Sequence, residues 1–266
     1  RPDSVPRCAD EPQIGSSCLR ASFPPWLIGL VHQITALLRA LETVVNSGIT
    51  VVVAAGNEEP GGYTLNVLCA ARGVICVGAA DQSLRSVADF SSWGPLPWGI
   101  PAPDLVAPGE NLVAAVPPNR SLQLSGTSLS APFVAGVVAL LKQYDPSLQP
   151  AQIKSILTST STQLAVPYYY GPPPISVGGG LINASAAIRT HLNLNVGNDF
   201  KLLLRPNSTS RICITSKSYQ EIRFYTYEFY SYLGASAMPP DIVSITPQQV
   251  YVAPLSTVCI NVSVAQ

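Results

Sequence analysis

The stretch QLSGTSLSAPFVAGVVALLKQY, residues 123 to 144, crowds hydroxyl residues at the head of an apolar helix. Ser128 lies where a strand passes into this helix, so unpaired backbone N–H groups and the positive end of the helix dipole point at its oxygen. Gly126 permits a tight turn, and Pro132 is expected in the first helical turn, where its missing N–H costs little. An oxyanion formed beside Ser128 would be stabilised. The alternative is that these residues only cap a buried helix. Local sequence and helix geometry do not distinguish an N-cap from a nucleophile here.

Two motifs resemble those of the subtilisin-like serine proteases. GTSLSAPFVAGVVALL is similar to the family's nucleophile motif, G-T-S-x-[SA]-x-P followed by a long internal helix, which puts the nucleophile at Ser128. VVVAAGN resembles the strand whose terminal Asn donates a side-chain N–H to the tetrahedral intermediate, and it falls on Asn57, 71 residues earlier. The other reading of Asn57 is a polar residue that closes a strand through a Gly-Asn turn.

Three more segments resemble the family at the expected places: FSSWGP, PDLVAPGENLVAA and GGGLINASAAI. The likeness therefore covers about residues 27–190. It implies an α/β fold, part of a subtilisin-like three-layer domain with a parallel sheet. It also implies a serine-type endopeptidase acting on a protein or peptide substrate through an acyl-enzyme on Ser128, with no cofactor.

The pattern breaks at the catalytic base. Relatives carry an Asp in D-[ST]-G and a His in H-G-T before the Asn, and neither motif occurs here. The only histidines are His32, on a mostly apolar helix, and His191, at the exit of the last helix, and neither position suits a base. Asp104 matches a loop segment of the family rather than the triad Asp. Phe133 replaces a His that relatives carry outside the triad, which predicts altered packing under the helix.

The chain therefore resembles the C-terminal half of a catalytic domain that begins after the His, and alone it should not hydrolyse peptides. Its expected partner is the missing N-terminal half, either covalently joined or present as a second chain after cleavage around residues 1–25. The strand at residues 50–55 is apolar on both faces and needs neighbours on both sides. The alternative function is a non-catalytic fragment or pseudoenzyme whose β domain binds a protein or glycan partner.

Periodicity predicts the elements that would position Ser128 and Asn57. Apolar residues recur every three or four positions from Leu27 to Val45, typical of an amphipathic helix, and β-branched runs at 49–57 and 73–80 predict buried parallel strands. Residues 89–118 alternate short strand-like pieces with prolines and glycines, and they are expected to run over the surface rather than add long regular elements. Further helices are expected after Gln149, with Pro150 in the first turn, and near residues 183–190.

The C-terminal part of the sequence changes to period-two alternation from about residue 199. Runs such as RICITSKS and TVCINVSV predict a small antiparallel β domain, a sandwich that resembles the fibronectin-III-like domain following the catalytic domain in many relatives. The predicted division is residues 1–195 for the partial catalytic domain and 196–266 for the β domain.

Composition excludes several classes of protein. The 266 residues carry no net charge, 47% are hydrophobic and 11% are charged, which favours a globular protein and argues against a nucleic-acid partner. The run from Trp26 to Val45 is interrupted by His32, Gln33, Arg39 and Glu42 and is not expected to span a membrane. No metal site is suggested by the cysteines, histidines or carboxylates. The first 25 residues lack the apolar segment of a signal peptide.

The six cysteines form three sets that are plausible pairs: Cys8 with Cys18, Cys69 with Cys76, and Cys213 with Cys259. Disulfides would place the protein in an oxidising compartment, whereas the alternative is six unrelated buried thiols. Four N-x-[ST] sequons occur, at Asn119, Asn183, Asn207 and Asn261, and they lean mildly toward glycosylation. Together these features favour a secreted or extracellular protein.

Overall fold

The structure is a computed structural model, and it describes residues 25–58, 64–95, 101–164, 174–190, 192–195, 207–216, 222–225, 243–247 and 249–264. Cys8, Cys18 and His191 lie outside the described residues, as does the side chain of His32.

A three-stranded parallel sheet forms the centre of the larger part of the chain. Strands β1 (Val52–Ala54), β2 (Ile75–Ala80) and β5 (Leu105–Pro108) lie in the order β1-β2-β5, with Val52 beside Ile75 and Val77 beside Leu105. Every residue of β2 is buried, as expected for a strand covered on both faces. The two predicted β-branched strands are therefore confirmed.

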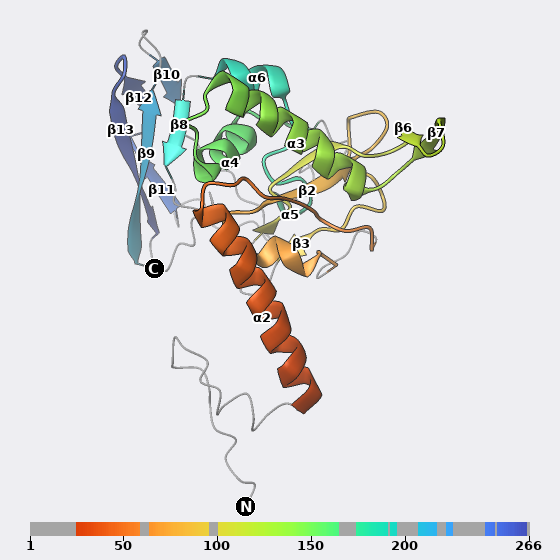
Figure 1. Cartoon of the computed structure of the whole chain (residues 1–266). Helices are drawn as coiled ribbons and strands as arrows, with labels where there is room; N and C mark the ends of the chain where they lie inside the picture. The colour runs from red at the N-terminus through yellow and green to blue at the C-terminus, as the bar shows by residue number, and fades with distance from the viewer. Residues whose placement is uncertain are drawn as a thin grey trace, which may run out of the picture.

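Helices cover both faces of this sheet, which gives the three layers of an α/β fold (Figure 1). On one face, Ile75 and Val77 pack with α3 (Thr127–Tyr144) and α4 (Pro150–Ser159). On the other, Val53 and Ala55 pack with the C-terminal half of α2 (Pro25–Asn46) and the 3-10 helix η1 (Val67–Ala70). Within β2, Ile75 and Val77 belong to the first cluster and Cys76 to the second, because alternate residues of a strand point to opposite faces.

Two expectations from the sequence were wrong in detail. Residues 89–118 do not all run over the surface, because Leu105, Val106 and Ala107 are fully buried in β5. β5, a strand of four residues, lies among these prolines and glycines and is buried in the sheet. Pro132 lies inside α3 rather than in its first turn, because the helix begins at Thr127. It therefore withholds a backbone hydrogen bond from the Ser128 carbonyl.

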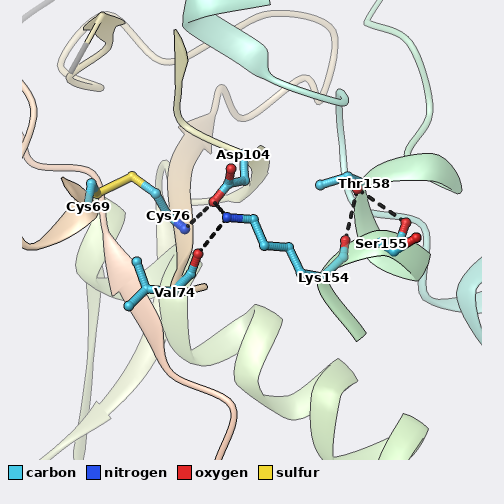
Figure 2. A network of polar contacts seen from close by, with 7 residues as sticks. All are labelled: Cys69, Val74, Cys76, Asp104, Lys154, Ser155 and Thr158. Atoms are coloured by element: carbon cyan, nitrogen blue, oxygen red, sulfur yellow. Dashed lines mark hydrogen bonds and ion pairs between the residues drawn. A yellow bond between two sulfur atoms is a disulfide. The ribbon is translucent and has the colours of Figure 1, made fainter. Parts of the chain in front are cut away.

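A buried ion pair ties α4 to the sheet (Figure 2). Lys154 Nζ lies 3.0 Å from Asp104 Oδ2 and donates to the Val74 carbonyl at 2.8 Å. The same Asp104 oxygen accepts the Cys76 N–H at 2.8 Å. Cys76 is also bonded to Cys69 in a disulfide, so the start of β2 is held both by the buried ion pair and by a covalent bond.

Shorter elements complete the part of the chain up to residue 190. The antiparallel pairs are β3 (Gly94–Pro95) with β4 (Pro101–Ala102) and β6 (Leu112–Val116) with β7 (Arg120–Leu124), and the helices are α5 (Pro174–Val177) and α6 (Ala184–Arg189). The expected helix near 183–190 is confirmed, and Asn183 forms its N-cap.

The described C-terminal residues form antiparallel strands. A four-stranded sheet has the order β11 (Val243–Thr246), β13 (Thr257–Val264), β9 (Ser208–Ser216) and β8 (Leu192–Asn195), and β10 (Ile222–Tyr225) pairs with β12 (Gln249–Val252). Ile214 and Ile260 of the first sheet pack with Val250 and Val252 of β12. Cys213 and Cys259 face each other across β9 and β13 and form the second disulfide. The division at residue 195 stays a prediction.

Candidate active site

Ser128 is the second residue of α3 and its side chain is exposed. The hydroxyls beside it are used for structure. Ser130, fully buried, donates to the carbonyls of Ala107 and Pro108 at 3.1 Å and so fastens the first turn of α3 to the end of β5. Gly126 occupies the N-cap and supplies no side-chain hydrogen bond. The capping interpretation therefore does not account for Ser128, whose hydroxyl faces solvent beside the helix N-terminus.

Asn57 follows the carboxyl end of β1, and its amide is held by Thr127. Asn57 Oδ1 accepts the Thr127 backbone N–H at 2.9 Å and the Thr127 hydroxyl at 3.0 Å. Thr127 Oγ1 in turn accepts the Gly56 N–H at 3.1 Å. Both contacts use the amide oxygen, and the Asn57 NH₂ group lies beside Gly126, with Nδ2 3.4 Å from where a Cβ of residue 126 would stand.

Gly126 lies between the two predicted site residues. A Cβ added at Gly126 would be 3.1 Å from Ser128 Oγ and 3.4 Å from Asn57 Nδ2. One carbon atom placed there would thus contact both groups, so Ser128 and Asn57 border the same small space. Glycine leaves this space open, and a side chain at position 126 would fill it.

A second contact fixes the turn that carries Asn57. The Ser92 hydroxyl, fully buried, accepts the Glu58 N–H at 2.9 Å, and the Ser92 N–H donates to the Gly56 carbonyl at 3.0 Å. Ser92 therefore binds the residues on both sides of Asn57. This gives a structural reason for the serines of the FSSWGP segment, since Ser91 likewise accepts the Ala79 N–H at 3.0 Å.

The arrangement supplies donors for an anion but no base. Asn57 Nδ2 and the Ser128 backbone nitrogen lie 3.4 and 3.8 Å from where a Cβ of residue 126 would stand, so donor groups of both elements border the space beside Ser128 Oγ, where negative charge would be stabilised. Among the described residues, no His, Asp or Glu side chain hydrogen-bonds to Ser128 Oγ. Asp104, expected to be a loop residue outside the triad, is buried against Lys154.

Sequence reasoning missed Thr127 and Lys154. The sequence contains a signal for Thr127. This residue follows a glycine N-cap, so its hydroxyl does not cap the helix and can hydrogen-bond to another element. Lys154 follows the inward-facing Ile153 on α4, which predicts at least partial burial of its side chain.

The described residues hold no cluster of three or more His, Cys, Asp or Glu side chains able to bind a metal ion. A search of the same residues found no helix with the length and hydrophobicity needed to cross a membrane.

Known proteins resemble a large part of this chain. Residues 28–172 match the model of the subtilase family. The serine protease AprX of Bacillus subtilis (strain 168) is 33% identical over 172 residues, which cover 57% of this chain and 38% of that protein. Subtilisin DY of Bacillus licheniformis is 37% identical over 155 residues, covering 58% of this chain and 52% of that protein. The chain thus spans about half or less of the length of these curated relatives.

Among solved structures, that of the prenylagaramide maturation protease PagA is 28% identical, with a TM-score of 0.49 over 58% of this chain and 55% of that one. More than half of the sequence lies within the family match. The chain belongs to the subtilase family.

Proposed function

We propose that this chain contributes the nucleophile, Ser128, and the oxyanion donor, Asn57, to a serine endopeptidase. The observation that carries the proposal is the shared space at Gly126, which Ser128 Oγ and Asn57 Nδ2 border from opposite elements. A substrate carbonyl in this space would meet Ser128 Oγ as nucleophile. The oxygen that becomes negative in the tetrahedral intermediate would meet the Asn57 amide and the helix N-terminus.

In this mechanism, the Ser128 oxygen bonds to the carbonyl carbon as its proton passes to a general base, and the same proton returns to the leaving amine. Water then repeats the sequence on the acyl-enzyme. The base is a His oriented by an Asp in this family. We propose that a segment outside these 266 residues supplies both, so the 266-residue chain alone has only the residual rate given by binding and oxyanion stabilisation.

Two exposed features support such a partner segment. Within the described residues, β1 pairs only with β2, so its other edge is free to accept a strand. α3 exposes an apolar stripe of Phe133 (46% exposed), Leu140 (47%) and Tyr144 (65%), and nothing lies within 4 Å of a Cβ added at Gly136. We had expected Phe133 to pack under the helix; its exposure fits packing against the partner segment instead.

Three further parts of the proposal concern the whole protein. The C-terminal strands, with their cross-strand disulfide, support a fibronectin-III-like domain after the catalytic part. The disulfides Cys69–Cys76 and Cys213–Cys259 support residence outside the cell, because such bonds persist in oxidising compartments. The substrate is a protein or peptide.

A fluorophosphonate probe tests the proposal, because it labels a serine only when the base is in place. We expect labelling of Ser128 in the native protein that carries the upstream segment, loss of labelling in Ser128→Ala, and no labelling of the isolated 266-residue chain. Asn57→Ala should slow labelling by about 10² to 10³, the range measured for deletion of an oxyanion-hole donor in a subtilisin. A folded native protein that does not react would contradict the proposal and favour a non-catalytic role.

A further inference from the structure

The four N-x-[ST] sequons of the chain lie in two different structural settings. We propose that Asn119, Asn207 and Asn261 are N-glycan acceptors and that Asn183 is a helix cap that stays unmodified. A glycan is bulky and hydrated, so an occupied Asn must be exposed on the folded protein and its side chain must not be needed to hold the fold together. Asn119, Asn207 and Asn261 are exposed, whereas Asn183 is partly exposed and its amide is hydrogen-bonded within the fold.

Asn119 lies at the tip of the β6–β7 hairpin, which projects from the body of the molecule on the side opposite the C-terminal strands (Figure 1). Its side chain is exposed and makes no hydrogen bond to a described residue. Its φ of 60° is typical of an Asn in a turn. Ser121, which supplies the hydroxyl, is also exposed.

Asn207 and Asn261 lie on the β9–β13 pair. Asn207 is exposed in the turn that precedes β9, with a φ of 57°, and Asn261 is exposed in the middle of β13. The hydroxyls of their sequons, Thr209 and Ser263, are cross-strand partners 2.9 Å apart. Since alternate residues share a face, Asn261 and Ser263 point to the same side of the strand. One side of this pair of strands therefore carries two acceptor sites.

Asn183 is different because both ends of its amide are engaged. Its Oδ1 accepts the Ala186 N–H at 2.9 Å as the N-cap of α6, and its Nδ2 donates to Thr162 Oγ1 at 3.2 Å. The side chain is only partly exposed. A sugar on Nδ2 would project into the segment around Thr162, which pairs with Leu181. The cap and the glycan therefore compete for one side chain.

The reaction is a transfer from a lipid-linked oligosaccharide diphosphate. Asn Nδ2 forms a bond to the anomeric carbon and loses one proton, while the bond from that carbon to the diphosphate oxygen breaks and the lipid diphosphate leaves. The donor is found where disulfides also form, and two disulfides are present. The inference does not depend on Ser128 or on peptidase activity.

The test is expression of the full chain behind a secretion leader in eukaryotic cells, followed by release of N-glycans by amidase in H₂¹⁸O. Each occupied Asn becomes an ¹⁸O-labelled Asp, which peptide mass spectrometry locates. We expect the label at positions 119, 207 and 261 and not at 183. Label at 183 in the folded, secreted protein, or absence of label at the three exposed sites, would overturn the proposal.

Matched variants separate acceptor loss from misfolding. Ser121→Ala, Thr209→Ala and Ser263→Ala each remove one sequon hydroxyl but keep the Asn, and each should lose one glycan by gel mobility. Ser185→Ala removes the sequon hydroxyl of Asn183 and should leave mobility unchanged. Asn183→Asp, which retains a cap acceptor, should keep the unfolding midpoint of the parent protein, whereas Asn183→Ala should lower it. An unchanged midpoint in Asn183→Ala would contradict the capping role.

Discussion

At the residue scale, Thr127 connects the two halves of the candidate site. Its hydroxyl accepts from Gly56 and donates to Asn57, so a single side chain orients the amide beside Ser128. It is buried, and its hydroxyl is already hydrogen-bonded to Gly56 and Asn57, so it is not available as a nucleophile. Thr127 is therefore a positioning residue for the proposed oxyanion donor.

Replacing Thr127 with Val tests this role. The isosteric change removes the hydroxyl donor to Asn57 and leaves the Gly56 N–H without its acceptor, so we expect Ser128 labelling in the native protein to slow by about tenfold, equivalent to one hydrogen bond of about 1.4 kcal/mol. Thr127→Ser keeps the hydroxyl and should restore most of the rate. Equal labelling rates in the Val and Ser variants would show that the hydroxyl is not needed.

Asp81, just after β2, makes stability depend on pH. Partial burial acts to raise its pKa, but hydrogen bonds from the Ser83 hydroxyl and the backbone of Ser86, Arg85 and Leu84 prevail and lower the pKa below 3.8. A lowered folded-state pKa contributes stability above the unfolded pKa, and this contribution is lost as pH falls through the folded value.

We therefore expect Asp81→Asn to be less stable than the parent chain at neutral pH, by less than about 1 kcal/mol because the loop is partly exposed. The difference should shrink as pH falls below the ordinary aspartate pKa of about 3.9 and through the lowered folded-state value. Urea unfolding at a series of pH values measures it. A difference that is constant with pH would assign the effect to the amide's hydrogen bonds rather than to the charge.

At the scale of elements, the Asp104–Lys154 pair holds α4 against the start of β2. Both side chains are almost fully buried, so removing one partner leaves an uncompensated charge in the interior. Lys154 also satisfies the Val74 carbonyl, which lies beside the apolar core of the sheet.

Lys154→Met should lower the free energy of unfolding by about 3 to 5 kcal/mol, and adding Asp104→Asn should recover part of this loss because no bare charge remains. Lys142→Met is the matched control: its ammonium also donates to a backbone carbonyl, that of Leu148 at 2.6 Å, but it is not buried. We expect a change of less than about 1 kcal/mol there. Similar losses at the two lysines would show that the ion pair contributes nothing specific.

Elements were predictable to different degrees for physical reasons. α2 is a long periodic segment and β2 lies in a continuous apolar run, and their sequences indicate them directly. β5 was expected only as one of several short strand-like pieces at the surface, because its burial depends on pairing with β2 rather than on local propensity. Ser128 and Asn57 were found through motifs, whereas the role of Thr127 depends on a contact across 70 residues that no local pattern shows.

At the scale of the whole molecule, the exposed stripe on α3 is unusual for the helix that carries the proposed nucleophile. Apolar side chains line its outer face, while Leu141 and Val134 of the same helix are in the core. An apolar patch of this kind marks an interaction surface, here proposed for the segment that supplies the His and Asp.

Leu140→Gln tests this surface. In the isolated chain it should change the free energy of unfolding by less than about 0.5 kcal/mol, because the side chain is already in solvent. In the native protein with its upstream segment it should lower both stability and Ser128 labelling. Leu141→Ala, at a buried neighbour, should destabilise both forms by about 2 to 5 kcal/mol. Equal small effects of Leu140→Gln in both forms would show that the stripe remains uncovered.

The bond from the Gly56 N–H to the Thr127 hydroxyl spans 71 residues, and this has a consequence for biosynthesis. The chain between them contains β2, β5 and the β6–β7 hairpin, all of which must emerge and fold before Asn57 can meet α3. Contacts of such long range form late, because the loop has to close first. A nascent chain would therefore not bring together the proposed nucleophile and oxyanion donor until synthesis had passed Thr127, so the topology of the chain itself would delay assembly of the candidate site.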